Sequence, residues 1–94
     1  MKSDKPEKKI VGVTAELSQL RGVYSNLANI SHTNREFIFD FFLQLQDQGQ
    51  LVSRIITNPP HAKAFLNALM KNVEKYESKF GVINDPSGPG ANNK

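Results

Sequence analysis

The side chains that could carry out chemistry are few in this 94-residue chain, and no motif groups them. The two histidines, His32 and His61, stand far apart, and the chain has no cysteine. Two lone histidines without a ligand spacing do not define a metal site, and thiolate chemistry is excluded. The sequence also has no glycine-rich phosphate loop, no nucleophile elbow and no carboxylate pair at a catalytic spacing. We therefore expect no enzymatic activity, no metal and no cofactor.

One oppositely charged pair, Asp40 and Arg54, falls within two segments rich in apolar residues. Residues 36–45 read EFIFDFFLQL, and this alternation predicts a central β-strand. One face of that strand carries the phenylalanines at 37, 39 and 41, and the other carries Asp40. Residues 51–57 predict the next strand, in which Arg54 can lie opposite Asp40.

Two further strands are expected before the central one, at residues 9–14 and 23–33. Between them, Thr14 is a plausible cap for one or two helical turns that end at Gly22. Asparagine is uncommon in strands, so Asn26 and Asn29 are expected to bond neighbouring backbone at a bulge or an edge. Turns are expected at residues 32–35 and 47–50, the second using Gly49 for a positive φ.

A long amphipathic helix follows, capped by Asn58, with Pro59 at its first position and Gly81 at its end. Its apolar residues step by three and four along one stripe: Ala62, Phe65, Leu66, Leu69, Val73, Tyr76 and Phe80. About 22 helical residues span about 33 Å, enough to cross a sheet. The expected fold is therefore α+β: an antiparallel β-meander of about four strands, with this helix packed across the phenylalanine face.

The domain organisation is expected to be simple, with one domain at residues 9–83 between disordered tails at 1–8 and 84–94. The net charge of +3 lies mainly in the first tail, so nucleic-acid binding is unlikely by charge. No apolar run is long enough to cross a membrane, and no signal peptide is recognisable. These features, with the absence of cysteine, predict a cytoplasmic protein.

One helix shelters one sheet face, so the other face is expected to stay apolar and uncovered. The residues expected on that face are Leu27, Ile38, Asp40, Phe42, Val52, Arg54 and Ile56. A self-complementary homodimer or higher homo-oligomer is the favoured explanation. A protein or peptide partner, and a partly exposed sheet trimmed by the amino-terminal strand, stay open.

Several segments together resemble one short prokaryotic family, the domain of unknown function 3467. The matching segments are residues 22–32 (GVYSNLANISH), 36–41 (EFIFDF), 53–57 (SRIIT), 59–63 (PPHAK) and 74–77 (EKYE). The resemblance implies a small stand-alone soluble protein without an assigned activity. Its motif positions in this chain are Tyr24, Asn26, Asp40, Arg54, His61 and Tyr76. The predicted layout is also similar to that of SecB-type export chaperones, which makes a peptide-binding chaperone the alternative function.

Overall fold

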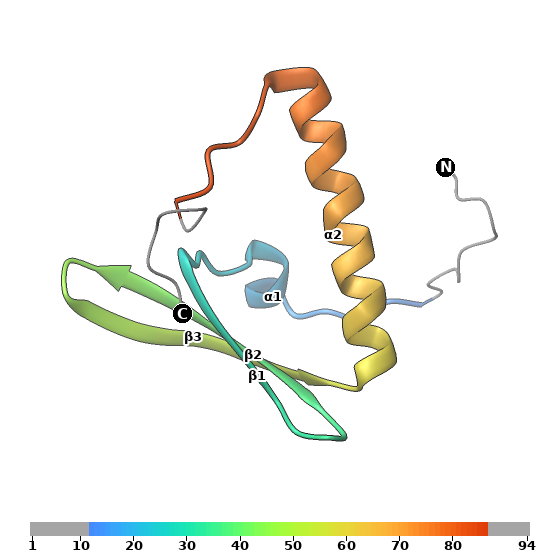
Figure 1. The fold of residues 1–94 in the computed structure, drawn as a ribbon. Coiled ribbons are helices and arrows are strands. Elements are labelled where there is room, and N and C mark those ends of the chain that lie inside the picture. The colour runs from blue at the N-terminus through green and yellow to red at the C-terminus, as the bar shows by residue number, and fades with distance from the viewer. Residues whose placement is uncertain (1–11, 87–94) are drawn as a thin grey trace. The chain divides into compact units, whose positions relative to one another are not determined.

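The computed structural model describes residues 12–86, shown in Figure 1. Within this part the elements are α1 (Leu17–Arg21), β1 (Leu27–His32), β2 (Phe37–Leu45), β3 (Gln48–Thr57) and α2 (Pro59–Phe80). The α+β class and the long carboxyl-terminal helix are therefore confirmed. No helix in residues 12–86 is long and apolar enough to cross a membrane.

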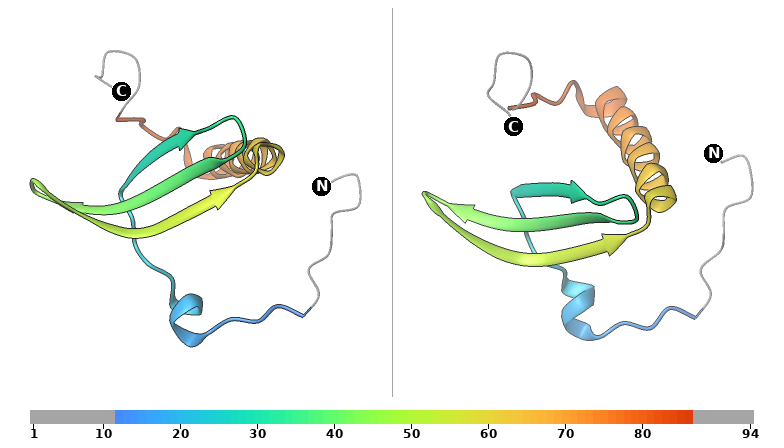
Figure 2. Two further views of the ribbon diagram at one scale, coloured as in Figure 1. Left: turned by 90° about the horizontal axis from the view of Figure 1, so that it is seen from below. Right: turned by 60° about the horizontal axis from the view of Figure 1, so that its bottom comes forward.

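The three strands form one antiparallel sheet in the order β1, β2, β3, as Figure 2 shows. The central position predicted for the alternating segment is thus confirmed. The expected fourth strand is not: residues 12–14 are not in a strand, and residues 9–11 lie outside the described part. The predicted tails, apart from residues 84–86, also lie outside it.

The turn between β2 and β3 lies earlier than predicted. Gln46 and Asp47 form it, and Gln46 takes the positive φ of 57° that was expected at Gly49. Gly49 lies instead inside β3. Paired strands of nearly equal length leave two residues for the connection, so the turn residue adopts the conformation that the hairpin requires.

The short helix α1 begins at Leu17 and not directly after Thr14. Glu16 is its cap: Oε1 of Gln19 accepts a hydrogen bond from the Glu16 backbone N–H at 2.9 Å. This arrangement is the reciprocal capping box, which satisfies donors at a helix start. The predicted end is confirmed, since Gly22 has a φ of 76° that an L side chain rarely adopts.

β1 begins at Leu27, later than expected, because two side chains before it bond to β2. The carboxamide of Asn26 pairs with the backbone of Gln44: Nδ2 donates to the carbonyl at 2.9 Å, and Oδ1 accepts from the N–H at 2.8 Å. The carbonyl of Phe42 accepts from the Ser25 hydroxyl at 2.9 Å and from the Asn26 N–H at 3.0 Å. The expected backbone bonding of Asn26 is therefore confirmed.

The chain divides into two compact units. The first unit holds the described residues up to Asn29 together with Asp40–Arg54, and the second holds Ile30–Phe39 together with the described residues from Ile55 onward. The strands pass through both units, so the two ends of the sheet have different surroundings. Each contact discussed below joins residues of the same unit.

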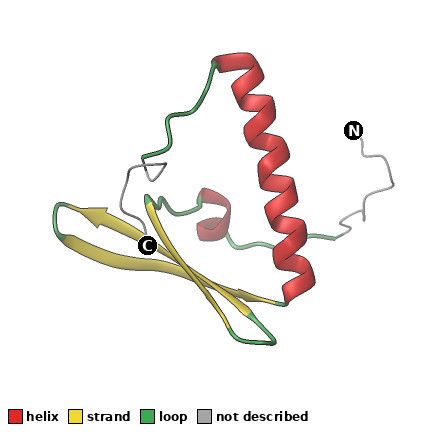
Figure 3. Cartoon of the chain, viewed as in Figure 1, coloured by secondary structure: helices red, strands yellow, loops and turns green. Residues whose placement is uncertain are grey.

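The second unit contains α2 and the strand segments on which it packs. Figure 3 shows α2 as one uninterrupted helix. The predicted cap is confirmed, since Oδ1 of Asn58 accepts from the backbone N–H of His61 at 2.8 Å. The rings of Phe39 and Phe65 lie 5.5 Å apart, which confirms that the helix meets the phenylalanine face here.

Packing in the described part nevertheless buries very little. Phe39, at 8% exposure, is the one large apolar residue of residues 12–86 that is buried. The helical stripe was expected to be covered by the sheet, but none of the α2 residues is buried. The helix is longer than the strand segments of its unit, so they shelter only part of its apolar stripe.

Phe39→Ala is expected to lower the free energy of unfolding by about 3–5 kcal/mol, because a buried phenylalanine leaves a cavity when truncated. Urea denaturation followed by circular dichroism measures this loss. Leu45→Ala, in the same strand and 64% exposed, is the matched control and is expected to change stability much less. Equal losses in the two variants would contradict the assignment of Phe39 to the core.

Asn26→Ala is expected to cost about 1–2 kcal/mol, because two hydrogen bonds to an exposed strand segment are lost. Hydrogen exchange should show the loss most strongly at the Gln44 amide, which bonds directly to the Asn26 side chain. The control is Asn29→Ala, at an exposed position within β1. Unchanged protection of the Gln44 amide in Asn26→Ala would show that the side chain does not extend the sheet.

Candidate functional site

Asp40 in β2 and Arg54 in β3 form a bidentate ion pair in the first unit, as their predicted cross-strand placement requires. Nε of Arg54 lies 2.6 Å from Oδ1 of Asp40, and Nη2 lies 3.0 Å from Oδ2. Two parallel N–H···O bonds hold both side chains in a defined orientation. Asp40 is buried at 7% exposure, whereas the Arg54 side chain is 56% exposed. The guanidinium therefore covers the carboxylate and presents its outer edge to solvent.

The two side chains stabilise each other's charge. The hydrogen bonds from Arg54 lower the pKa of Asp40; its burial opposes this shift, and the positive charge of Arg54 adds to it. The same hydrogen bonds, followed by the charge attraction, raise the pKa of Arg54. Both groups therefore stay ionised at neutral pH, and neither is suited to exchange a proton with a substrate.

The neighbours of the pair on this face are apolar. Successive side chains of a strand alternate between faces, so Phe42 of β2 and Val52 of β3 share the face of Asp40 and Arg54. In β1, the ring of His32 stacks on Phe37 at 5.3 Å, which places the even-numbered residues of β1 on the opposite face.

Leu27 therefore lies on the same face as the ion pair. Phe42 and Val52 are half-buried, and Leu27 is 47% exposed. We call the surface formed by Leu27, Asp40, Phe42, Val52 and Arg54 the ion-pair face. All five residues belong to the first unit, whereas the other two predicted interface residues, Ile38 and Ile56, belong to the second.

The remaining polar candidates do not gather around this pair. His32 ends β1, and His61 lies in the first turn of α2. Within residues 12–86 no group of three or more histidine, aspartate or glutamate side chains could hold a metal ion. Sequence reasoning missed the cap at Glu16 and the hydroxyl contact of Ser25. The Glu-x-x-Gln spacing could have indicated the first.

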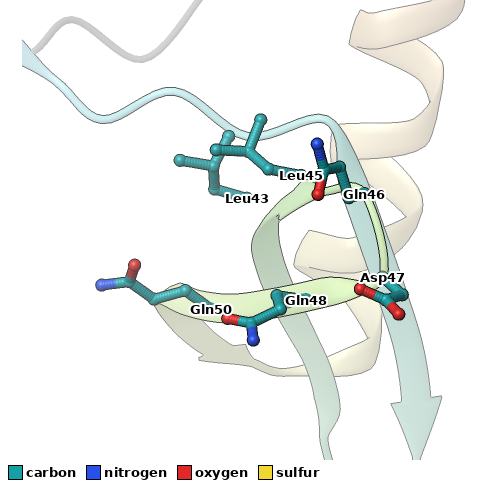
Figure 4. Close-up of a pocket in the computed structure, with 7 residues that line it drawn as sticks. Leu43, Leu45, Gln46, Asp47, Gln48 and Gln50 are labelled. Atoms are coloured by element: carbon teal, nitrogen blue, oxygen red, sulfur yellow. The ribbon is translucent and has the colours of Figure 1, made fainter.

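A shallow depression lies at the tip of the hairpin between β2 and β3, in the first unit (Figure 4). It measures about 470 Å³ and is lined by Leu43, Leu45, Gln46, Asp47, Gln48, Gly49 and Gln50. Asp47 is the one charged residue among them, and the others supply no base or nucleophile. This depression has the composition of an exposed turn, and we assign no chemistry to it.

Fold and site together define a small α+β protein whose most organised polar feature is an ion pair on an apolar sheet face. The chain matches the family model described as "Protein of unknown function (DUF3467)" over residues 1–85 and belongs to that family. The resemblance noted in the sequence is thereby confirmed. Comparison with curated proteins found no match, and comparison with solved structures found none either.

Acidification is expected to destabilise the protein through Asp40. Its pKa is lower in the folded chain than the ordinary value of about 3.9 in the unfolded chain. The stabilisation is therefore complete above about pH 4 and is lost as the pH falls toward the folded pKa, because the unfolded state takes up the proton first.

Urea denaturation between pH 2 and pH 6 measures this effect when the parent is compared with Asp40→Asn. The difference in unfolding free energy between the two should shrink as the pH falls below about 4. Asp47→Asn, at the exposed hairpin turn, controls for a general charge effect. A pH-independent difference between the parent and Asp40→Asn would contradict the role of the carboxylate charge.

Proposed function

We propose that this protein is a non-enzymatic interaction module that self-associates through the ion-pair face. The observation that carries the proposal is the shortage of buried apolar surface: in residues 12–86, Phe39 is the one buried large apolar residue. Burial of apolar surface is the main favourable term in folding, at about 25 cal/mol per Å². A chain with so little of it gains stability by covering its apolar faces with a partner.

The ion-pair face has the composition of such a contact. Leu27, Phe42 and Val52 supply apolar area, and the Arg54 guanidinium is anchored on one side and open on the other. Covering this face would desolvate the pair, which limits the net affinity that it adds. Its contribution would be orientation, since a partner must offer acceptors where the outer guanidinium N–H groups point.

A second copy of the chain is the simplest partner for this face. In a two-fold contact each copy presents the same surface, so an apolar patch meets an apolar patch without a separate complementary protein. The ion pair neutralises itself within each copy, so two such faces can approach without facing like charges that are uncompensated. A separate protein or peptide as occupant would be recognised by an assembly mass that stays monomeric.

The absence of catalysis belongs to the proposal. The most ordered charged groups are paired with each other, with the pKa of Asp40 lowered and that of Arg54 raised. A general base or acid needs a pKa near the working pH, and these shifts move both groups away from it. An interaction module needs fixed charges, and this arrangement supplies them.

Phe42→Asp is expected to lower the assembly mass in sedimentation velocity by at least half, because a charge at the centre of the contact would be buried unpaired. Leu45→Asp is the matched control: it lies in the same strand, on the opposite face by alternation, and is 64% exposed. The control should keep the parent mass. Circular dichroism establishes that each variant is folded.

Two results would overturn this proposal. One is a folded Phe42→Asp variant with the parent's mass. The other is a loss of mass in Leu45→Asp that equals the loss in Phe42→Asp, which would place the contact on the phenylalanine face. A parent that is monomeric at all concentrations would exclude self-association.

A further inference from the structure

The apolar stripe of α2 has a regular spacing that packing within the second unit does not use up. Six apolar residues follow one another at alternating steps of four and three: Ala62, Leu66, Leu69, Val73, Tyr76 and Phe80. This alternation is the heptad seam through which two helices pack side by side. Leu66, Val73 and Phe80 occupy one class of seam position, and the other three residues occupy the second.

The seam is open along its length in the described structure. Tyr76 is 51% exposed and Phe80 is 66% exposed, and no residue of α2 is buried. The rings of Tyr76 and Phe80 lie 4.9 Å apart, so they form one aromatic projection near the end of the helix. Nζ of Lys79 lies 5.7 Å from the centre of the Phe80 ring.

An apolar groove lies at the other end of the same seam. It measures about 620 Å³ and is lined almost entirely by apolar atoms, from Ile30, Phe37, Phe39, Pro59, Pro60, Ala62, Lys63, Phe65, Leu66 and Leu69. All these residues belong to the second unit. The unit thus carries an aromatic projection at one end of α2 and an apolar groove at the other.

We propose that the groove is occupied by the Tyr76 and Phe80 side chains of a second copy, through antiparallel pairing of the two α2 helices. Antiparallel pairing puts the two classes of seam position opposite each other. In that register Phe80 lies opposite Ala62 of the second copy, Tyr76 opposite Leu66, and Val73 opposite Leu69. The largest seam residue therefore meets the smallest, which lines the groove.

The charges that flank the seam favour the same orientation. Lys63 and Glu77 occupy equivalent flanking positions, which face each other across an antiparallel pair. Each lysine therefore meets a glutamate of the second copy, twice by symmetry. Parallel pairing would instead put Phe80 against Phe80 and Ala62 against Ala62, and would leave Lys63 without its acidic partner.

The aromatic residues supply a substantial share of the area for such a contact. A Phe or Tyr side chain buries about 150–250 Å² when it is covered. Two per copy contribute about 300–500 Å², against the 800 Å² or so per partner of an ordinary stable interface. The four aliphatic seam residues add to this area, so the contact reaches the size of a specific interface.

This pairing is separate from the ion-pair face and does not rest on the proposed function. The two contacts use different units of the chain. Two independent two-fold contacts on one chain build assemblies larger than a dimer. The test is therefore made in the Phe42→Asp background, where the ion-pair face is disabled and the helix contact acts alone.

Cross-linking tests the pairing and its direction, because the chain has no cysteine of its own. Phe42→Asp chains carrying Lys63→Cys are mixed with Phe42→Asp chains carrying Glu77→Cys and treated with a short bismaleimide. The mixture should form at least fivefold more covalent dimer than either variant alone. A mixture of Lys71→Cys and Glu77→Cys chains is the control, because Lys71 lies on the outer side of the helix by the heptad spacing.

The outcomes separate the two proposals. No excess of dimer in the mixture, or as much from either variant alone, overturns antiparallel α2 pairing whatever Phe42→Asp does to the mass. Excess dimer in the mixture supports the pairing even where Phe42→Asp leaves the mass of the cysteine-free chain unchanged, a result that overturns only the ion-pair face.

Charge reversal supplies a second readout that does not depend on cross-linking. In the Phe42→Asp background, Lys63→Glu should weaken the dimer about three- to tenfold in Kd, since it creates two like-charge contacts near the surface. Adding Glu77→Lys should restore the affinity, and Lys71→Glu should change it less than twofold. A double variant that stays as weak as Lys63→Glu would overturn the Lys63–Glu77 contact.

Discussion

Scarcity of buried apolar surface is the constraint on which the rest of this structure depends. In residues 12–86 only Phe39 among the large apolar side chains is sheltered from water, and it owes this to β2 and to the Phe65 ring. A small domain stands or falls by the apolar area that it removes from solvent. The exposed remainder, on the ion-pair face and along α2, is therefore the part of the molecule through which association would add stability.

Polar side chains compensate locally for this thin packing by prolonging the backbone order of the sheet. The Asn26 carboxamide bonds to Gln44 as a strand residue would, and the Glu16–Gln19 reciprocal pair starts α1. The Asp40–Arg54 bonds tie β2 to β3 through their side chains. Hydrogen bonds of this kind each contribute modestly, but they specify geometry where apolar packing alone would leave it loose.

The two proposed contacts follow from the same shortage and differ in what directs them. On the ion-pair face, an anchored guanidinium within apolar surroundings gives direction to a contact that would otherwise slide. Along α2, the direction comes from the match between large and small seam residues and from Lys63 with Glu77. A chain of this length thus offers two surfaces of different chemistry, one in each compact unit.

Local patterns in the sequence were sufficient for the central strand, for the capped start of α2 at Asn58, for its end at Gly81 and for the Asp40–Arg54 pairing. Each of these depends on side-chain alternation, on a cap, or on residues that neighbouring strands bring opposite each other. The tertiary structure alone decided that residues 12–14 form no strand, that Gln46 takes the turn conformation, and that the stripe of α2 stays open. Those features depend on how much partner surface the folded chain provides, and a periodic pattern shows which face is apolar without showing what covers it.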